Sequence, residues 1–213
     1  MESSSTPPKT RIVSIHIWKW KEKGPILLCE ATHLDGLWFF QKKTAGEHIR
    51  FSSRLICQDT RLGTKCSTTL ENEIGVCHCW TTSEGLSVTT ITSPGYPEAS
   101  AYNMIGQIII DFMAAFENDT EMYMEVEEDT KLKYDNLETF LNNWQKPEEA
   151  DKIYKIKTEL TEVTDIMHKN MEDLLKRGES LDALMAKSKD LSTMSVEFYK
   201  KAKKKNQRCC TLS

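Results

Sequence analysis

Residues 153–202 read IYKIKTELTEVTDIMHKNMEDLLKRGESLDALMAKSKDLSTMSVEFYKKA, and their spacing decides the architecture of the chain. Mostly apolar residues recur there after alternating steps of three and four positions, without a break. About seven such heptads predict one long helix that offers a seam to partner helices. At about 1.5 Å per residue the helix would be about 75 Å long, which is too long for the core of a globular domain. The seam positions are Ile153, Ile156, Leu160, Val163, Met167, Asn170, Leu174, Arg177, Leu181, Leu184, Ser188, Leu191, Ser195, Phe198 and Ala202.

The centre of this seam carries an arginine between leucine layers. Arg177 follows Leu174 and precedes Leu181, and a guanidinium buried there without acceptors would be very costly. Two arginines would meet in a parallel homodimer, so the layer favours a heteromeric bundle whose partner helices supply amide or carboxylate oxygens. The alternative is an antiparallel coil from which Arg177 extends its charged end to solvent.

The run 174–184, LLKRGESLDAL, resembles the centre of an R-SNARE motif, and the resemblance extends over residues 147–208. It implies that Arg177 forms the central layer of a four-helix bundle. Three Q-SNARE helices (Qa, Qb and Qc) would each contribute a glutamine to that layer. The bundle would zipper from Ile153 toward Ala202 and drive membrane fusion without catalysis, and the chain would not form homo-oligomers.

The first half of the chain predicts a small α+β domain. Strands are expected near 11–20, 26–31, 66–70, 75–81 and 86–92, because these runs are rich in β-branched or alternating apolar residues. Helices are expected at 45–57 and 98–117, and a short amphipathic helix at 137–144. Residues 1–10 read as a disordered extension, 11–117 as the domain core and 118–146 as an acidic linker with the short helix.

This order of elements, placed ahead of an R-SNARE motif, resembles a longin domain. Phe39-Phe40-Gln41 before the first helix and Tyr96-Pro97 before the second agree with the resemblance. It implies a profilin-like fold with a five-stranded antiparallel sheet flanked by helices. It also implies that the SNARE helix folds back on the domain, with Phe51, Phe39 and Phe40 on the docking surface. The alternative is that Phe51 simply belongs to the domain core.

The C-terminus carries two cysteines after a cluster of lysines. Cys210-Thr211-Leu212-Ser213 has the form of a prenylation signal, whose terminal serine favours farnesyl. Cys209 is placed to take a second lipid, and one lipid chain alone anchors only weakly. Five lysines and an arginine between residues 200 and 208 would face anionic headgroups. The alternative for residues 209–213 is a frayed tail with two exposed thiols.

Together these features resemble the lipid-anchored longin R-SNAREs of the Ykt type. The resemblance implies a cytosolic and peripheral membrane protein on the cytoplasmic face of Golgi, endosomal or vesicle membranes, acting in vesicle transport. A non-fusogenic, lipid-tethered coiled-coil scaffold would show the same features, except for the role of Arg177.

Other classes of protein fit the sequence poorly. We expect neither a secretory signal nor a membrane span, because residues 1–10 are polar and 104–116 are too short. The net charge of −4 gives no sign of nucleic-acid binding. The phosphate-binding motif of a GTPase is absent, and Cys77 and Cys79 should face away from His78 in a strand. We therefore expect no catalytic site, no cofactor and no metal.

Overall fold

The computed structural model describes residues 11–35, 39–70, 75–153, 165–175 and 180–209. The chain divides into two compact units. The first contains residues 1–33 and 53–174, and the second contains residues 34–52 and 175–213. Each unit is described here by itself.

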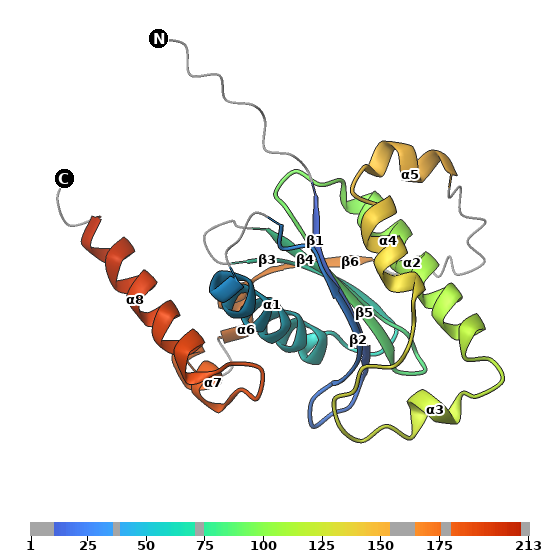
Figure 1. Cartoon of the computed structure of the whole chain (residues 1–213), viewed down its shortest axis with the longest axis horizontal. Helices are drawn as coiled ribbons and strands as arrows, with labels where there is room; N and C mark the ends of the chain where they lie inside the picture. The colour runs from blue at the N-terminus through green and yellow to red at the C-terminus, as the bar shows by residue number, and fades with distance from the viewer. Residues whose placement is uncertain (1–10, 36–38, 71–74, 154–164, 176–179, 210–213) are drawn as a thin grey trace, which may run out of the picture. The chain divides into compact units, whose positions relative to one another are not determined.

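The first unit is built on a six-stranded sheet with the order β2-β1-β5-β4-β3-β6 (Figure 1). Neighbouring strands are antiparallel except for β3 and β6, which are parallel. The strands are β1 (Ile12–Lys19), β2 (Ile26–Thr32), β3 (Thr64–Thr69), β4 (Val76–Thr81), β5 (Leu86–Thr92) and β6 (Ile166–Asn170). The predicted α+β class and the five predicted antiparallel strands are therefore confirmed.

Eight helices accompany the sheet in the part of the chain that the structure describes. The first predicted helix begins earlier and ends later than its apolar spacing indicated, whereas the second agrees within two residues. The helices are α1 (Phe39–Asp59), α2 (Glu98–Ala115), α3 (Glu121–Met124), α4 (Asn136–Asn143), α5 (Pro147–Ile153), α6 (Met171–Leu175), α7 (Leu181–Lys187) and α8 (Thr193–Cys209).

The main core lies between the sheet and the two helices α2 and α4, which cover one of its faces (Figure 1). Ile105, Ile108 and Phe112 of α2 are fully buried there, together with Trp144 after α4. Their spacing of three and four positions places them on one side of the helix. Each buried side chain of this size contributes about 1.5–3 kcal/mol.

The acidic linker is ordered along the free edge of β2. The backbone N–H of Thr130 donates to the carbonyl of Leu27, and that of Leu132 donates to the carbonyl of Leu28, both at 2.9 Å. Arg54 holds the linker through a 2.7 Å ion pair with Asp129. We call residues 129–132 the strap, because they cover the edge of β2 that does not pair with β1.

Residues 147–205 do not form the single helix that the heptads predict. In this state of the chain α5, β6, α6, α7 and α8 divide the segment, and β6 joins the sheet. A long helix with an apolar seam is not stable without partner helices, since most helix stability in proteins comes from tertiary packing. The edge of β3 supplies an alternative partner for part of the segment.

Candidate functional site

The predicted partner-binding seam is the candidate site, and the structure describes only part of it. Arg177, Ile156, Leu160, Val163 and Cys210 lie outside the described residues. The side chains of Ile153, Phe39, Phe40 and Cys209 also lie outside them, although the backbones of these residues belong to α5, α1 and α8. The roles of these residues stay predictions.

Two seam residues, Met167 and Asn170, lie in β6 and are committed to the sheet. Met167 is paired with Cys66, and Asn170 with Thr69, in the parallel register of β6 on β3. A residue cannot follow an extended strand and a continuous α-helix at the same time. The pairing of β6 with β3 therefore excludes a continuous helix through this part of the seam.

Two side chains between these seam residues anchor β6 to opposite faces of the sheet. Lys169 forms a 2.5 Å ion pair with Asp59 at the end of α1, and both side chains are largely buried. Nε2 of His168 donates a 3.0 Å hydrogen bond to Oε1 of Glu98, in the first turn of α2. Successive strand residues point to opposite faces, so one strand contacts a helix on each side of the sheet.

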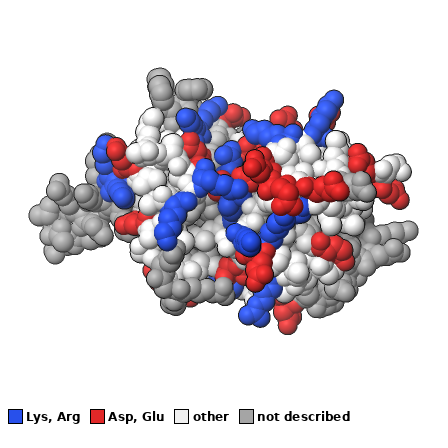
Figure 2. Space-filling view, turned by 90° about the horizontal axis from the view of Figure 1, so that it is seen from below, with Lys and Arg blue, Asp and Glu red and all other residues white. Residues whose placement is uncertain are grey.

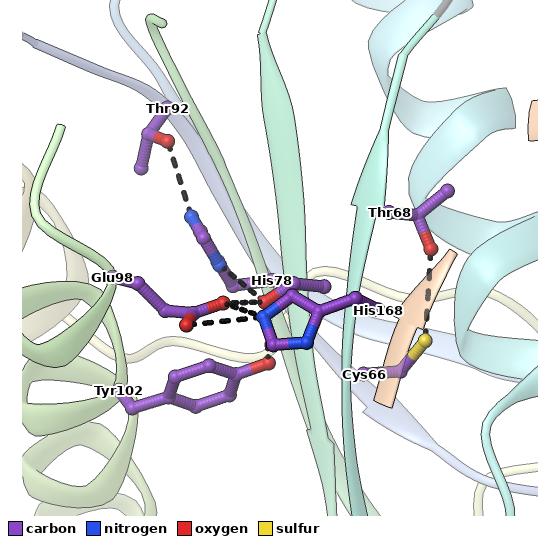
Figure 3. Close-up of polar contacts among 8 residues, drawn as sticks. Cys66, Thr68, His78, Thr92, Glu98, Tyr102 and His168 are labelled. Atoms are coloured by element: carbon purple, nitrogen blue, oxygen red, sulfur yellow. Dashed lines mark hydrogen bonds and ion pairs between the residues drawn. The ribbon is translucent and has the colours of Figure 1, made fainter. Parts of the chain in front are cut away.

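Glu98 belongs to a partly buried polar cluster (Figure 3). Its Oε1 accepts a 2.5 Å hydrogen bond from Ser67, whose oxygen lies 2.9 Å from Nδ1 of His78 and 3.0 Å from the hydroxyl of Tyr102. Burial alone would raise the pKa of Glu98, but the contacts with Ser67 and His168 outweigh burial and lower it. Burial lowers the pKa of His78 to about 4.

This cluster has the residue types of a hydrolase site but not the arrangement. Ser67 donates its proton to a carboxylate and is only 4% exposed, so it is neither activated nor accessible. The cluster is a polar network whose members satisfy one another's hydrogen bonds, and it fixes α2 against β3 and β4. Glu98 lies at the rim of the cluster, where it also contacts His168 of β6.

A reciprocal capping interaction ends β6 and begins α6. The backbone N–H of Asp173 donates to Oδ1 of Asn170, and the backbone N–H of Asn170 donates to Oδ2 of Asp173, both at 3.0 Å. This arrangement is a capping box, which satisfies backbone donors at a helix start. Asn170 is thus a helix cap here, although the heptads place it in the middle of a longer helix. Leu174, the next seam residue, is buried.

The second unit brings the first part of α1 together with the end of the seam. Oε2 of Glu47 accepts hydrogen bonds from the backbone N–H and hydroxyl of Ser192, at 2.8 and 2.7 Å, and from the hydroxyl of Ser195 at 2.6 Å. Nε2 of His48 lies 3.2 Å from the carbonyl oxygen of Ser195, and its ring lies beside that of Tyr199. The seam residue Ser195 is consequently buried, at 1% exposure.

Other described seam residues differ in their exposure. Leu181 is buried, as is the neighbouring Met185. Three seam residues are half-buried, namely Leu184, Ser188 and Leu191, whereas Phe198 and Ala202 are exposed. Phe51 is buried, at 7% exposure, in the stretch of α1 that belongs to the same unit as α7 and α8. This burial agrees with both readings of Phe51, so its docking role stays a prediction.

The residues that hold the seam segment in this structure are not indicated by the sequence pattern. His168, Lys169 and Ser192 lie between seam positions, where the heptads assign no role, and their contacts to Glu98, Asp59 and Glu47 join distant parts of the sequence. The cysteines do follow the expected strand alternation, since Cys77 and Cys79 lie near Cys57 whereas His78 faces Tyr102. Within the described ranges, no group of side chains is suited to hold a metal ion.

Comparisons with known proteins identify the family. Residues 152–212 match the family model described as Synaptobrevin. The chain is 33% identical over 203 residues to the synaptobrevin homolog ykt6 of Schizosaccharomyces pombe, which covers 95% of this chain and all of that relative. It is also 33% identical to the synaptobrevin homolog YKT6 of Saccharomyces cerevisiae, over 95% of this chain and 99% of the relative. The VAMP-like protein YKT61 of Arabidopsis thaliana is 34% identical over 88% of this chain and 91% of its own length.

No helix among the described residues is both long enough and apolar enough to cross a membrane. Family membership also settles the enzymatic question, since synaptobrevins and their Ykt6 relatives are SNARE proteins and not enzymes. The chain belongs to the Ykt-type, synaptobrevin-like R-SNAREs, a family that acts in vesicle trafficking by bundling with partner SNAREs.

Proposed function

We propose that this chain drives membrane fusion by zippering with one Qa, one Qb and one Qc SNARE helix, and that its fold-back on the longin domain restrains this assembly. In the assembled bundle Arg177 lies in the central layer and meets three glutamines. Assembly proceeds from Ile153 toward Ala202. Each fully buried leucine or isoleucine layer contributes about 1.5–3 kcal/mol before the cost of ordering, so several layers together oppose membrane repulsion.

The pairing of β6 with β3 is the observation that carries the restraint. Met167 and Asn170 are held in an extended strand, and assembly needs them in a helix. Leu174, Leu181 and Ser195 are buried in the same state. A partner that binds the helical seam therefore competes with the contacts of the folded-back chain, and its apparent affinity falls with the population of that state.

The membrane attachment that we propose is lipidation of Cys210 by a farnesyl group and of Cys209 by a second lipid. The lysines at the end of α8 precede both cysteines, and a basic cluster adds attraction to anionic headgroups. Two lipid signals hold a protein on a membrane more durably than one. The attached protein serves transport at Golgi, endosomal or vesicle membranes from their cytoplasmic side.

The restraint is tested by a change that removes anchors of β6 and leaves every seam residue in place. The double variant H168A/K169A loses the contacts to Glu98 and Asp59. We expect assembly with three purified Q-SNARE motifs to accelerate about tenfold, because the two contacts together stabilise β6 by roughly 1–2 kcal/mol. The heat resistance of the finished complex should stay unchanged, since both positions lie outside the seam.

The matched control is the double variant D165A/K200A, which also introduces two alanines outside the seam. Asp165 and Lys200 are exposed, and their side chains form no hydrogen bond or ion pair in the described part of the chain. If H168A/K169A releases β6 but assembles no faster than the wild type, then fold-back does not restrain assembly. Separately, Arg177→Gln should weaken assembly with glutamine-type helices, whereas a generic scaffold would tolerate it.

A further inference from the structure

The end of α2 and the short helix α3 expose a group of apolar side chains in the first unit. The methionine patch consists of Ile110 (41% exposed), Met113 (44%), Met122 (51%) and Met124 (48%). Other exposed large apolar residues in the described ranges are Leu62 and the α8 residues Met194 and Phe198. The proposed fusion reaction uses none of the four residues in the methionine patch.

The exposure of the patch follows from how α2 and α3 are anchored. Ile109 and Phe112 of α2 face the core, so Ile110 and Met113, three positions apart, lie together on the outer side. In α3 the ring of Tyr123 is buried edge-on against Phe112, with ring centroids 5.4 Å apart. This contact turns the flanking residues Met122 and Met124 toward solvent.

The two helices contribute to one hollow rather than to separate exposed spots. Met113 and Met124 line a small hollow together with Tyr123, Leu86 and Glu84. Lys19 also lines it, but its ammonium group is occupied by the carbonyl oxygens of Met124 and Val126. Methionine side chains are flexible and polarisable, so a hollow that they line adapts to apolar side chains of different shapes.

The surroundings of the patch are strongly acidic. Residues 117–129 contain seven aspartates or glutamates and no lysine or arginine. Lys19 and Lys21 pair with Glu127, and Arg54 pairs with Asp129. In the described part of the chain no basic side chain pairs with the remaining exposed acids of this stretch, which are Glu117, Asp119, Glu125 and Glu128.

Figure 2 views the side of the molecule on which α3 lies in Figure 1, and it shows a band of acidic side chains with lysine and arginine side chains on both sides of it. The four unpaired acids of this stretch would repel an anionic membrane surface. A second copy of this chain that met the patch symmetrically would place acid against acid. A helix with an apolar stripe and a basic rim matches both the exposed methionines and the unpaired carboxylates.

We propose that the methionine patch binds a basic amphipathic helix of a partner protein. The apolar stripe of that helix packs on Met113, Met122 and Met124, and its lysines or arginines face the unpaired acids of residues 117–128. This interaction is independent of the seam and of the fusion reaction, so each can fail without the other.

The test measures binding of a fluorescent probe peptide to the full chain by fluorescence anisotropy. The probe is a helix of about 18 residues, five turns, with leucine and methionine on one face and lysine on the other. One control peptide has the same composition in an order that destroys the apolar face, and another has glutamate in place of lysine. We expect binding of the basic helix only, with an affinity that falls as salt is added.

Variants then locate the binding site. Met113→Gln combined with Met124→Gln should weaken binding at least about tenfold, because two apolar contacts are lost. Both side chains are exposed, so the fold should be unaffected, which circular dichroism checks. Glu125→Gln combined with Glu128→Gln should weaken binding and flatten its salt dependence. The matched control Met194→Gln changes an exposed methionine of α8 and should have no effect.

Several results would overturn the proposal. These are equal binding of the rearranged or acidic peptide, and unchanged binding by the Met113 and Met124 double variant. Self-association in analytical ultracentrifugation that this variant abolishes would assign the patch to a second copy. Binding to phosphatidylserine vesicles that the same variant abolishes would assign it to a membrane.

Discussion

Two strands of the same sheet, β5 and β6, differ in almost every property that fixes a strand. All seven residues of β5 are buried, and β1 and β4 pair with it on either side. The five residues of β6 are half-buried or exposed, and among the described strands only β3 pairs with it. The central strand has one stable structure, whereas the edge strand keeps its structure only while a few contacts hold.

Local sequence explains part of this difference. β5 reads LSVTTIT, in which five of the seven residues are β-branched, a composition that favours strands. β6 reads IMHKN and has one β-branched residue. Its conformation therefore depends on tertiary contacts, as the proposed transfer of these residues into a helical seam requires.

The largest predicted effect is a difference in unfolding free energy between side-chain truncations in β5 and in β6. Ile91 of β5 is 3% exposed, so Ile91→Ala should lower the free energy of unfolding by about 2–5 kcal/mol. Met167→Ala in β6 should cost less than about 1 kcal/mol, since its side chain is only half-buried. Urea denaturation measures both changes, and similar values would show that β6 is as much a part of the core as β5.

A smaller effect should appear on acidification. His78 lies on β4, next to β5, and burial lowers its pKa to about 4. Between pH 6.5 and 4 the unfolded chain therefore binds more protons at this residue than the folded chain does. Stability should fall as the pH falls through this range, by at most about 3 kcal/mol from this residue.

His78→Gln should flatten that part of the dependence of unfolding free energy on pH, measured by denaturant titration at several pH values. The replacement keeps a polar side chain near Ser67 and does not titrate. His33→Gln provides the matched control, because it makes the same replacement at a different, half-buried histidine. An unchanged slope in the His78 variant would mean that other groups cause the acid sensitivity.

The smallest effect should be confined to β6. Lys169→Ala removes the ion pair with Asp59, a contact worth about 1 kcal/mol. Amide hydrogen exchange should become about fivefold faster in β6 and stay unchanged in β5, because β6 opens locally. Lys200→Ala serves as the control. Equal acceleration in both strands would show that the sheet opens as one unit and would contradict the comparison.

The sequence predicted the longin-like strands and helices well, because their periodicity is local. β5 matched its predicted range, since seven mostly β-branched residues lie between clear turns. The position of β6 could not be predicted, because parallel pairing with β3 joins residues about 100 positions apart and leaves no local pattern. The heptads also dominate that region and favour a helix at every residue.

The contacts that hold the seam were equally invisible in the sequence. Nothing near His168 indicates that Glu98, 70 residues earlier, will face it. The capping role of Asn170 was hidden by its seam position, although Asn170 followed three residues later by Asp173 is a recognisable helix start. The role of Arg177 in the central layer stays a prediction, because this residue lies outside the described part of the chain.

The pairing of the sheet edges has a consequence for the state in which β6 has left the sheet, as the proposed assembly requires. The strap covers the edge of β2, whereas at the other side β6 covers β3 and is itself the edge strand. If β6 leaves the sheet as the proposed assembly requires, β3 (TKCSTT) presents unpaired backbone groups, with Lys65 as its one charged side chain. Exposed edges of this kind invite aggregation. In the proposed reaction an opened molecule is therefore prone to aggregate until it binds its partner helices or until β6 returns to β3.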